Sequence, residues 1–157
     1  MSEPISATVA PQDLGRFAFF EGLNRTELEL LAPITRVIDF KEGEPLFTTG
    51  DIAHSVFVVR EGFVNVMVEA GAVGKITVST IGPGEACGWS GIIPPHYFSA
   101  TGVATVPGSA LAVSAPKLRQ IMADDGAIAA TVLTRVAQMI AGRLRDTRYQ
   151  LIGMLNH

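Results

Sequence analysis

The stretch that decides the fold spans residues 55–71, SVFVVREGFVNVMVEAG, and continues as GKITVSTIGPG at residues 74–84. These short runs are rich in β-branched residues and are interrupted by glycine about every ten residues, which is typical of consecutive strands joined by tight turns. SATGVATV (99–106) and SALAVS (109–114) repeat the pattern. Because no long apolar helical segment separates these runs, they favour antiparallel strands in a sandwich or barrel. The middle of the chain is therefore predicted to be all β.

Helical patterns flank this β region. Before it, Asn24 is followed three residues later by Glu27, a capping-box spacing that predicts a short helix within RTELELLAPI (25–34). After it, Ser114 can cap a second short helix that carries Pro116 in its first turn. The chain is thus expected to run from short N-terminal helices through the strands to a helical C-terminal part.

A long final helix is predicted at about residues 127–154, because apolar residues recur there at steps of three and four. The stripe consists of Val132, Val136, Met139, Ile140, Leu144, Leu151 and Leu155. A helix of this length projects beyond a compact β body, so part of the stripe is expected to meet a second copy in a twofold homodimer. The alternative is that the stripe lies back on its own β body.

Size and composition suit one compact domain. The chain has 157 residues and a mass of 16.6 kDa, which leaves little room for a second core. Residues 1–12 are small, polar and proline-bearing and are expected to form a flexible arm, with the domain at 13–157. The 48% of hydrophobic residues leaves apolar surface for a partner.

Charge and cysteine content narrow the class of protein. The net charge of -3 provides no positive field for nucleic acid or acidic lipid, so neither DNA nor a membrane is an expected partner. Cys87 is the only cysteine, which excludes an intrachain disulfide and suits a reducing cytoplasmic setting. The N-terminus has no basic segment followed by an apolar run, so no signal peptide is expected.

In the order of its elements and in several local strings, the sequence resembles the cyclic nucleotide-binding domain family, as found in the sensor halves of bacterial catabolite-activator-type regulators. The resemblance implies a mainly β fold, an antiparallel β jelly roll (double-stranded β-helix) with flanking helices. The N-terminal helices are expected to be short, and the C-terminal helix is expected to be long and to dimerise. The strings are FFEGLNRTELELLA (19–32), FKEGEPLFTTGD (40–51), VFVVREGFVNV (56–66), IGPGEACGWSGI (81–92) and AGRLRDTRYQL (141–151).

The family holds its ligand in a cassette, which the resemblance places at residues 84–104 of this chain. There a glutamate accepts from the ribose and an arginine pairs with the cyclic phosphate, but Trp89 and Phe98 stand at these two positions. Loss of a cationic partner for a desolvated phosphate weakens binding by roughly 2–5 kcal/mol. Glu85 lies too early to replace the glutamate and more readily caps a turn or faces solvent.

Three hypotheses about the cassette stay open. Arg143 or Arg148 of the final helix can supply the missing cation, with Thr147 near the base, so that cyclic AMP or cyclic GMP still binds. Alternatively, the two aromatic residues line a cleft for a flat, weakly charged ligand, or they fill the space and nothing binds. The candidate ligand-binding residues are Gly84, Glu85, Gly88, Trp89, Ser90, Phe98, Ser99, Ala100, Arg143, Thr147 and Arg148.

Catalytic and metal chemistry are not expected. His54, His96 and His157 stand apart from one another and lack zinc-ligand spacing. A haem-binding variant of the family leaves His96 or Cys87 as an axial-ligand alternative. Ser90 lies in GWSG without the glycine spacing or the strand-to-helix turn of a hydrolase elbow.

The sequence therefore predicts a stand-alone regulatory sensor that binds a small ligand and signals through a dimer helix to a protein partner. One alternative is an interaction or scaffold protein that keeps the fold without a ligand. The other is a truncated transcriptional regulator, since a helix-turn-helix domain follows the long helix in the regulators that the chain resembles, whereas this sequence stops at His157.

Overall fold

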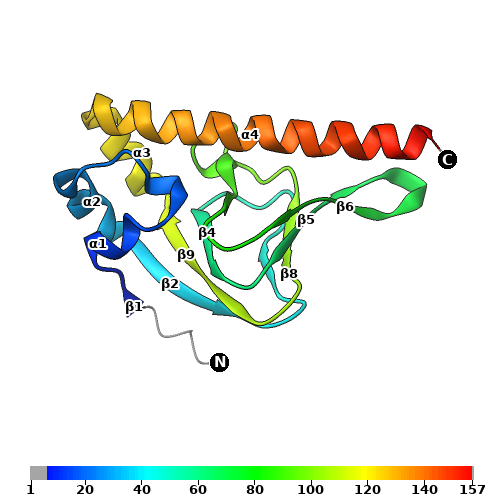
Figure 1. Ribbon diagram of the computed structural model, residues 1–157, viewed down its shortest axis with the longest axis horizontal. Coiled ribbons are helices and arrows are strands. Elements are labelled where there is room, and N and C mark those ends of the chain that lie inside the picture. The colour runs from blue at the N-terminus through cyan, green and yellow to red at the C-terminus, as the bar shows by residue number, and fades with distance from the viewer. Residues whose placement is uncertain (1–6, 157) are drawn as a thin grey trace.

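The strands form two antiparallel sheets that close into a β roll, and the helices gather at one end and one side of it (Figure 1). The computed structural model describes residues 7–156. One sheet has the order β1-β2-β9-β4-β7 and the other has the order β3-β8-β5-β6. The strands are β1 Ala7–Thr8, β2 Thr35–Phe40, β3 Pro45–Phe47, β4 Ser55–Glu61, β5 Val64–Glu69, β6 Lys75–Ile81, β7 Ala86–Cys87, β8 Thr101–Ala104 and β9 Gly108–Ser114. The predicted jelly roll is confirmed.

Two helices begin where the sequence predicts caps, at Asn24 and Ser114. Asn24 Oδ1 accepts from the Glu27 amide at 2.8 Å, and the Glu27 carboxylate accepts from the Asn24 amide at 2.9 Å, which completes the capping box. Ser114 caps α3, and Asp125 caps α4 through bonds from two amides. The α-helices are α1 Pro11–Leu14, α2 Arg25–Leu31, α3 Ala115–Asp124 and α4 Gly126–Leu155; the 3-10 helices are η1 Ala18–Phe20, η2 Ala32–Ile34, η3 Gly71–Val73 and η4 Trp89–Gly91.

The sheet that contains β4 is covered on both faces, which explains why its strands read as continuous apolar runs. Along β4, Val56 and Val58 point toward the helices, whereas Phe57 and Val59 point into the roll. β9 divides in the same way, with Leu111 on the helical side. The molecule therefore has one core between the two sheets and a second between this sheet and the helices.

The β4–β5 turn depends on a glycine. Gly62 has φ 92°, and a Cβ there would lie 3.2 Å from the Phe40 ring, from the Pro107 carbonyl and from Gly108 Cα. A residue with a side chain would be strained both by this φ and by these contacts. The turn joins β4 of one sheet to β5 of the other and so fixes how the roll closes.

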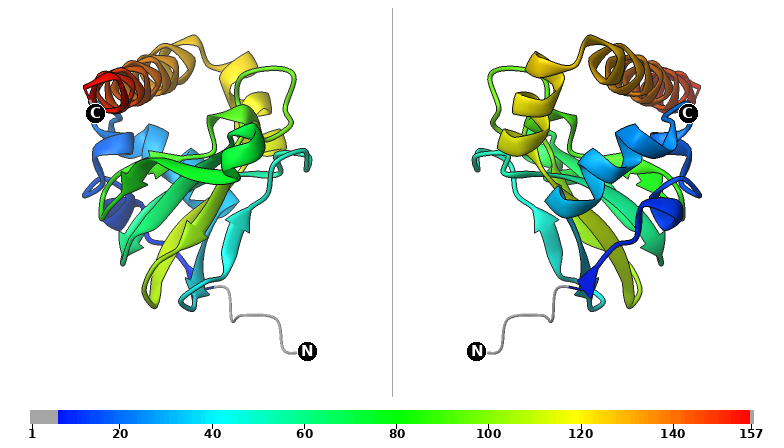
Figure 2. Two further views of the ribbon diagram at one scale, coloured as in Figure 1. Left: turned by 90° about the vertical axis from the view of Figure 1, so that its right-hand side faces the viewer. Right: turned by 90° about the vertical axis from the view of Figure 1, so that its left-hand side faces the viewer.

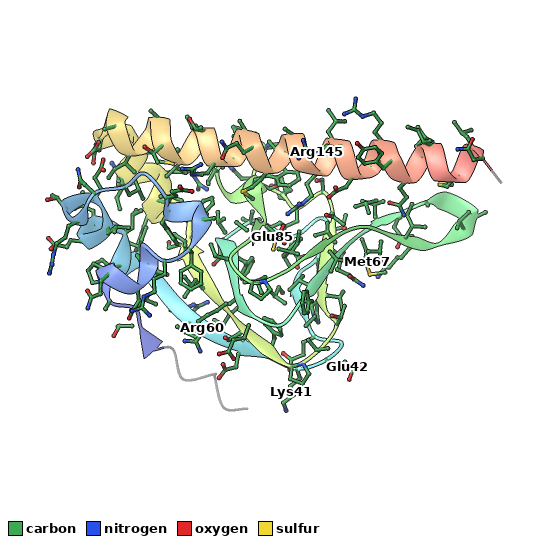
Figure 3. All side chains as sticks on the ribbon, viewed as in Figure 1. Lys41, Glu42, Arg60, Met67, Glu85 and Arg145 are labelled. Atoms are coloured by element: carbon green, nitrogen blue, oxygen red, sulfur yellow. The ribbon has the colours of Figure 1, made fainter. Side chains whose placement is uncertain are left out.

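Helix α4 lies across one end of the roll and continues along the β5–β6 hairpin (Figures 1 and 2). Lys41 and Glu42 lie at the opposite end of the roll (Figure 3). In the first half of α4, Val132 and Val136 are buried and Met139 packs against the same core. The alternative that the stripe lies on its own body thus holds for this half. The later stripe residues are exposed: Ile140, Leu144, Leu151 and Leu155.

Polar contacts hold the second half of α4 against β6. Ser79 Oγ donates to the Asp146 carboxylate at 3.0 Å, and Gln150 Nε2 donates to the Thr77 carbonyl at 2.8 Å. By length and composition α4 could also cross a membrane. Length and composition are weak evidence for a membrane span, since a helix that packs on a soluble domain can have the same length and composition.

The predicted flexible arm at residues 1–12 is too long. Ala7 and Thr8 pair with Val37 and Arg36 of β2, and α1 begins at Pro11. A two-residue pairing leaves no hydrophobic period in the sequence, which is why it was missed. Residues 1–6 lie outside the described residues.

Candidate functional site

The predicted cassette is the segment that leaves β6, forms β7 and η4 and returns into β8. Gly88 has φ 83° and stands before η4, where the chain turns sharply. From α3, Arg119 donates to the Gly91 carbonyl. From the loop, His96 Nδ1 donates to the Ser90 carbonyl at 2.8 Å. The cassette is therefore tied both to a helix and to its own loop.

Phe98 fills the interior of the cassette. Its side chain is 7% exposed and stacks on Phe47, with ring centroids 4.7 Å apart and an interplanar angle of 28°. Phe47 stacks in turn on Phe57 at 5.9 Å. Gly102 makes room for this column, because a Cβ there would lie 2.4 Å from the Phe47 ring. Three aromatic rings thus occupy the space between the two sheets.

The remaining cavity is small. Its volume is about 30 Å³, and its lining consists of Phe47, Val66, Cys87, Gly88, Trp89, Ser90, Phe98, Ser99 and Ala100. A water needs about 10–15 Å³ by this measure, and small-molecule sites usually measure 300–1,000 Å³. Of the three hypotheses, the filled cassette describes this conformation. Six predicted residues do meet here: Gly88, Trp89, Ser90, Phe98, Ser99 and Ala100.

Trp89 and Phe98 do not form two walls of one open cleft. The half-buried Trp89 packs against the core beneath the helices, whereas Phe98 belongs to the core inside the roll. The two side chains therefore support different cores, and the cavity lies where they meet. Ser99 is exposed, and Ser90 is half-buried.

Arg143 is the helix residue that reaches the cassette. Its Nη2 donates to the Ala86 carbonyl at 3.0 Å, and its side chain is 14% exposed. Its Nε is buried and has no hydrogen-bond partner among the described residues. Thr147 and Arg148 are exposed and line neither the cassette cavity nor the hollow beside α4. The structure thus distinguishes the two arginines, and Arg143 contacts the outside of β7 and does not line the cavity.

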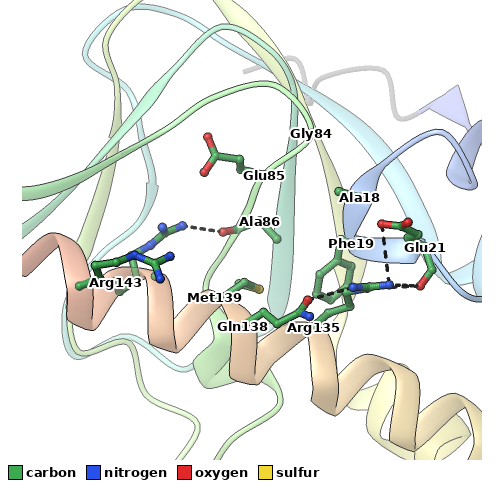
Figure 4. A pocket seen from close by; sticks show the side chains of 12 residues that line it. Ala18, Phe19, Glu21, Gly84, Glu85, Ala86, Arg135, Gln138, Met139 and Arg143 are labelled. Carbon is green, nitrogen blue, oxygen red and sulfur yellow. Dashed lines mark hydrogen bonds and ion pairs between the residues drawn. The ribbon is translucent and has the colours of Figure 1, made fainter.

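Gly84 and Glu85 also face away from the cavity. Glu85 Oε1 accepts from the Gly82 amide at 3.1 Å, and the side chain is exposed, so Glu85 caps the turn. With Arg143, both residues line a separate hollow of about 370 Å³ between η1, the cassette and α4 (Figure 4). Nine of the eleven residues predicted for one site therefore divide between two spaces, and Thr147 and Arg148 lie in neither.

Cys87 is not a reactive thiol. Burial raises the pKa of Cys87 to about 12; nearby Arg143 lowers it and Glu85 raises it further, but burial dominates. At neutral pH the thiol is protonated, which disfavours nucleophilic attack and metal ligation. Within residues 7–156, no group of three or more His, Cys, Asp or Glu side chains could hold a metal ion.

Sequence reasoning missed Phe47 and Val66, which line the cavity, and Phe57, which stacks on Phe47. None of the three was among the candidate site residues. The pairing of Phe47 with Gly102 across β3 and β8 places a large ring opposite a residue without a side chain. A long-range register of this kind leaves no local signal in the sequence.

An antiparallel roll with a cassette between its strands and a long helix across its end defines a regulatory ligand-binding domain, a class that is typically not enzymatic. Residues 37–125 match the family model described as the cyclic nucleotide-binding domain. This chain belongs to that family, whose members bind cyclic nucleotides such as cyclic AMP and are usually soluble.

Solved structures agree with the fold. A cyclic nucleotide-binding protein of Geobacter metallireducens is 24% identical, with a TM-score of 0.79 over 87% of this chain and 98% of that chain. A cyclic nucleotide-binding domain of Methylobacillus flagellatus is 21% identical, with a TM-score of 0.81 over 97% and 89%. The Thermus thermophilus catabolite activator protein is 24% identical, with a TM-score of 0.68 over 87% and 62%. A search of curated protein sequences finds no match.

Proposed function

We propose that this chain is a regulatory sensor module without catalytic activity, in which a change in the cassette shifts α4 and α4 presents the change to a protein partner. The observation that carries this proposal is the bond from Arg143 on α4 to the Ala86 carbonyl in the cassette. Because donor and acceptor lie on these two elements, a displacement of one changes the preferred position of the other. Arg119 links α3 to the same segment at Gly91.

The outer face of α4 supports pairing with a second copy. Exposed residues follow alternating steps of four and three, which is the spacing of a coiled-coil seam. These are Leu133, Ala137, Ile140, Leu144, Thr147, Leu151 and Met154. Val132 and Val136 lie about a quarter turn away around the helix and face the core. The proposed assembly is a twofold homodimer in which the cassette of each roll lies outside the seam. Thr147 belongs to this seam.

The proposed ligand is a small, flat and weakly charged molecule that enters the cassette by displacing Phe98. Phe47 and Phe98 separate the 30 Å³ cavity from an outer hollow of about 570 Å³ near Gly50 and His54. Rotation of the Phe98 ring toward the hollow would join the two spaces, and their combined size suits a small-molecule ligand. Cyclic AMP or cyclic GMP is disfavoured as the occupant, because no arginine lines the cavity.

The filled cavity also favours a second function, that of an interaction protein that keeps the fold without any ligand. In that case the dimer and the surface of α4 carry the activity. For both functions we place the protein in the cytoplasm without a DNA or membrane partner, since its net charge is -3 and its single cysteine is buried.

Ligand response separates these functions. Thermal unfolding is measured with millimolar cyclic AMP and cyclic GMP for the native chain, for Phe98→Ala and for Phe63→Ala, an exposed control outside the cassette lining. A ligand present at a hundred times its Kd adds about 2.7 kcal/mol, or several degrees. A shift in Phe98→Ala alone supports a sensor blocked by its own ring. A shift in none of the proteins contradicts cyclic-nucleotide binding, which agrees with the lack of an arginine in the cavity lining.

A further inference from the structure

A second hollow lies between η1, the start of the cassette and the inner face of α4, and we refer to it as the α4 groove (Figure 4). Its volume of about 370 Å³ falls within the range of small-molecule sites, in contrast to the cassette cavity. The residues that define it are Phe19, Glu85, Arg135, Met139, Gly142 and Arg143. The coiled-coil seam lies on the other face of the helix, so pairing with a second copy would leave the groove open.

Three arginine side chains line the groove, and they differ in their partners. Arg135 is already satisfied: Nη2 donates to the Glu21 carbonyl at 2.8 Å, Nη1 donates to Gln138 at 2.9 Å, and the Glu21 carboxylate lies 3.8 Å away. Arg143 lies 4.0 Å from Asp146, which is outside the lining. Within residues 7–156, Arg145 is therefore the lining arginine without an ion-pair partner.

These two arginines also have unused hydrogen-bond donors. Arg143 Nη2 is bound to Ala86 and Nη1 lies 4.0 Å from Asp146, but Nε is buried and unpartnered. An unmet buried donor is unfavourable unless a ligand or water accepts from it. Within residues 7–156, no hydrogen bond or ion pair involves the Arg145 side chain. Figure 3 places Arg145 on α4 and Glu85 below the helix.

The lining also includes two large apolar side chains and is open at one point. Phe19 and Met139 supply a ring and a thioether, both well suited to a flat apolar body. At Gly142, a Cβ would meet nothing nearer than Arg145 Nη2 at 3.9 Å. The glycine therefore leaves free space beside the helix backbone.

We propose that the α4 groove is a second ligand site, which binds a small organic anion with its acid group between Arg143 and Arg145 and its apolar body against Phe19 and Met139. The site is a separate space from the cassette cavity, with which it shares no lining residue. A ligand there contacts η1, the cassette and α4 together and so favours the docked position of the helix.

The test uses the full chain and phenyl phosphate as the ligand. Inorganic phosphate and phenol serve as separate probes for the acid group and the apolar ring of phenyl phosphate. Binding is followed by calorimetry and by backbone amide NMR shifts. Phenyl phosphate is expected to bind at least about tenfold more tightly than either half and to shift the amides of Gly142, Arg143 and Glu85. No binding of phenyl phosphate up to about 20 mM, or shifts confined to other segments, overturns the proposal.

Three variants locate the site. Arg145→Gln, at an exposed residue without structural contacts, is expected to weaken phenyl phosphate binding about tenfold. Gly142→Leu fills the groove and is expected to abolish binding. Gly153→Leu is the matched control: it raises helix propensity on the same helix, in open space outside the groove, and keeps native affinity. Equal affinity in Gly142→Leu and Gly153→Leu contradicts the proposed location.

Discussion

Replacement of Phe98 by alanine tests whether the cassette is filled in solution. The ring is 7% exposed and stacks 4.7 Å from Phe47. A buried phenyl group covers at least about 150 Å², which at about 25 cal/mol per Å² corresponds to roughly 4 kcal/mol of unfolding free energy. Measured Phe→Ala changes in cores span about 3–5 kcal/mol. Because the solvent-open hollow beside Phe98 lets water into the vacated space, we expect about 3 kcal/mol.

The assay is reversible thermal or urea unfolding of both proteins. A loss of about 3 kcal/mol lowers Tm by about 6–12 °C in a domain of this size. Phe63→Ala, which truncates a side chain that is 45% exposed, is the control and should lose roughly three-fifths as much by buried area. If Phe98→Ala loses under about 1 kcal/mol, the ring does not occupy the core in solution, and the reasoning about the filled cassette is refuted.

Three further changes test other parts of the structure. The pKa of Cys87 is raised from 9.0 to about 12, so above pH 9 the unfolded chain releases a proton that the folded chain keeps. The unfolding free energy should therefore fall by about 1.4 kcal/mol between pH 7 and pH 10. In urea unfolding, Cys87→Ala should not show this fall with pH. Leu144→Asp places a charge in the proposed α4 seam and should give a monomer in light scattering, whereas Tyr149→Asp, exposed but off the seam, should leave the mass unchanged. Asn24→Ala removes the cap that accepts from Glu27 and should lower the unfolding free energy by about 1 kcal/mol; an unchanged urea midpoint would argue against the capping box.

Local patterns in the sequence were sufficient for the secondary structure. The capping box at Asn24 and the cap at Ser114 each depend on residues within one turn, and both are present as predicted. Helix α4 differs from its predicted bounds by one residue at each end. The predicted arm failed at Ala7 and Thr8 because their pairing partners lie in β2, far along the chain.

The candidate site was predictable only in part. The course of the cassette backbone depends on residues close together in the sequence, whereas the side chains that fill it come from distant strands. The resemblance to the family implied the position of the cassette, and its glycines stand in the sequence itself. What fills the cassette depends on the register that sets Phe47 against Gly102, and on the stack of Phe98 on Phe47. The same limit applies to the α4 groove, which unites residues from η1, the cassette and α4.

The sequence by itself predicted the strands and the flanking helices, since these follow from local periods, and its resemblance to the family implied the jelly roll and the two cassette positions held by Trp89 and Phe98. Only the tertiary structure decided that Phe98 closes the cassette and that Arg143 turns inward while Arg148 stays exposed. The direction of a side chain on a helix depends on how the helix is rotated against the sheet. That rotation is fixed by Ile128, Val132 and Val136, whose packing against the core buries one face of α4.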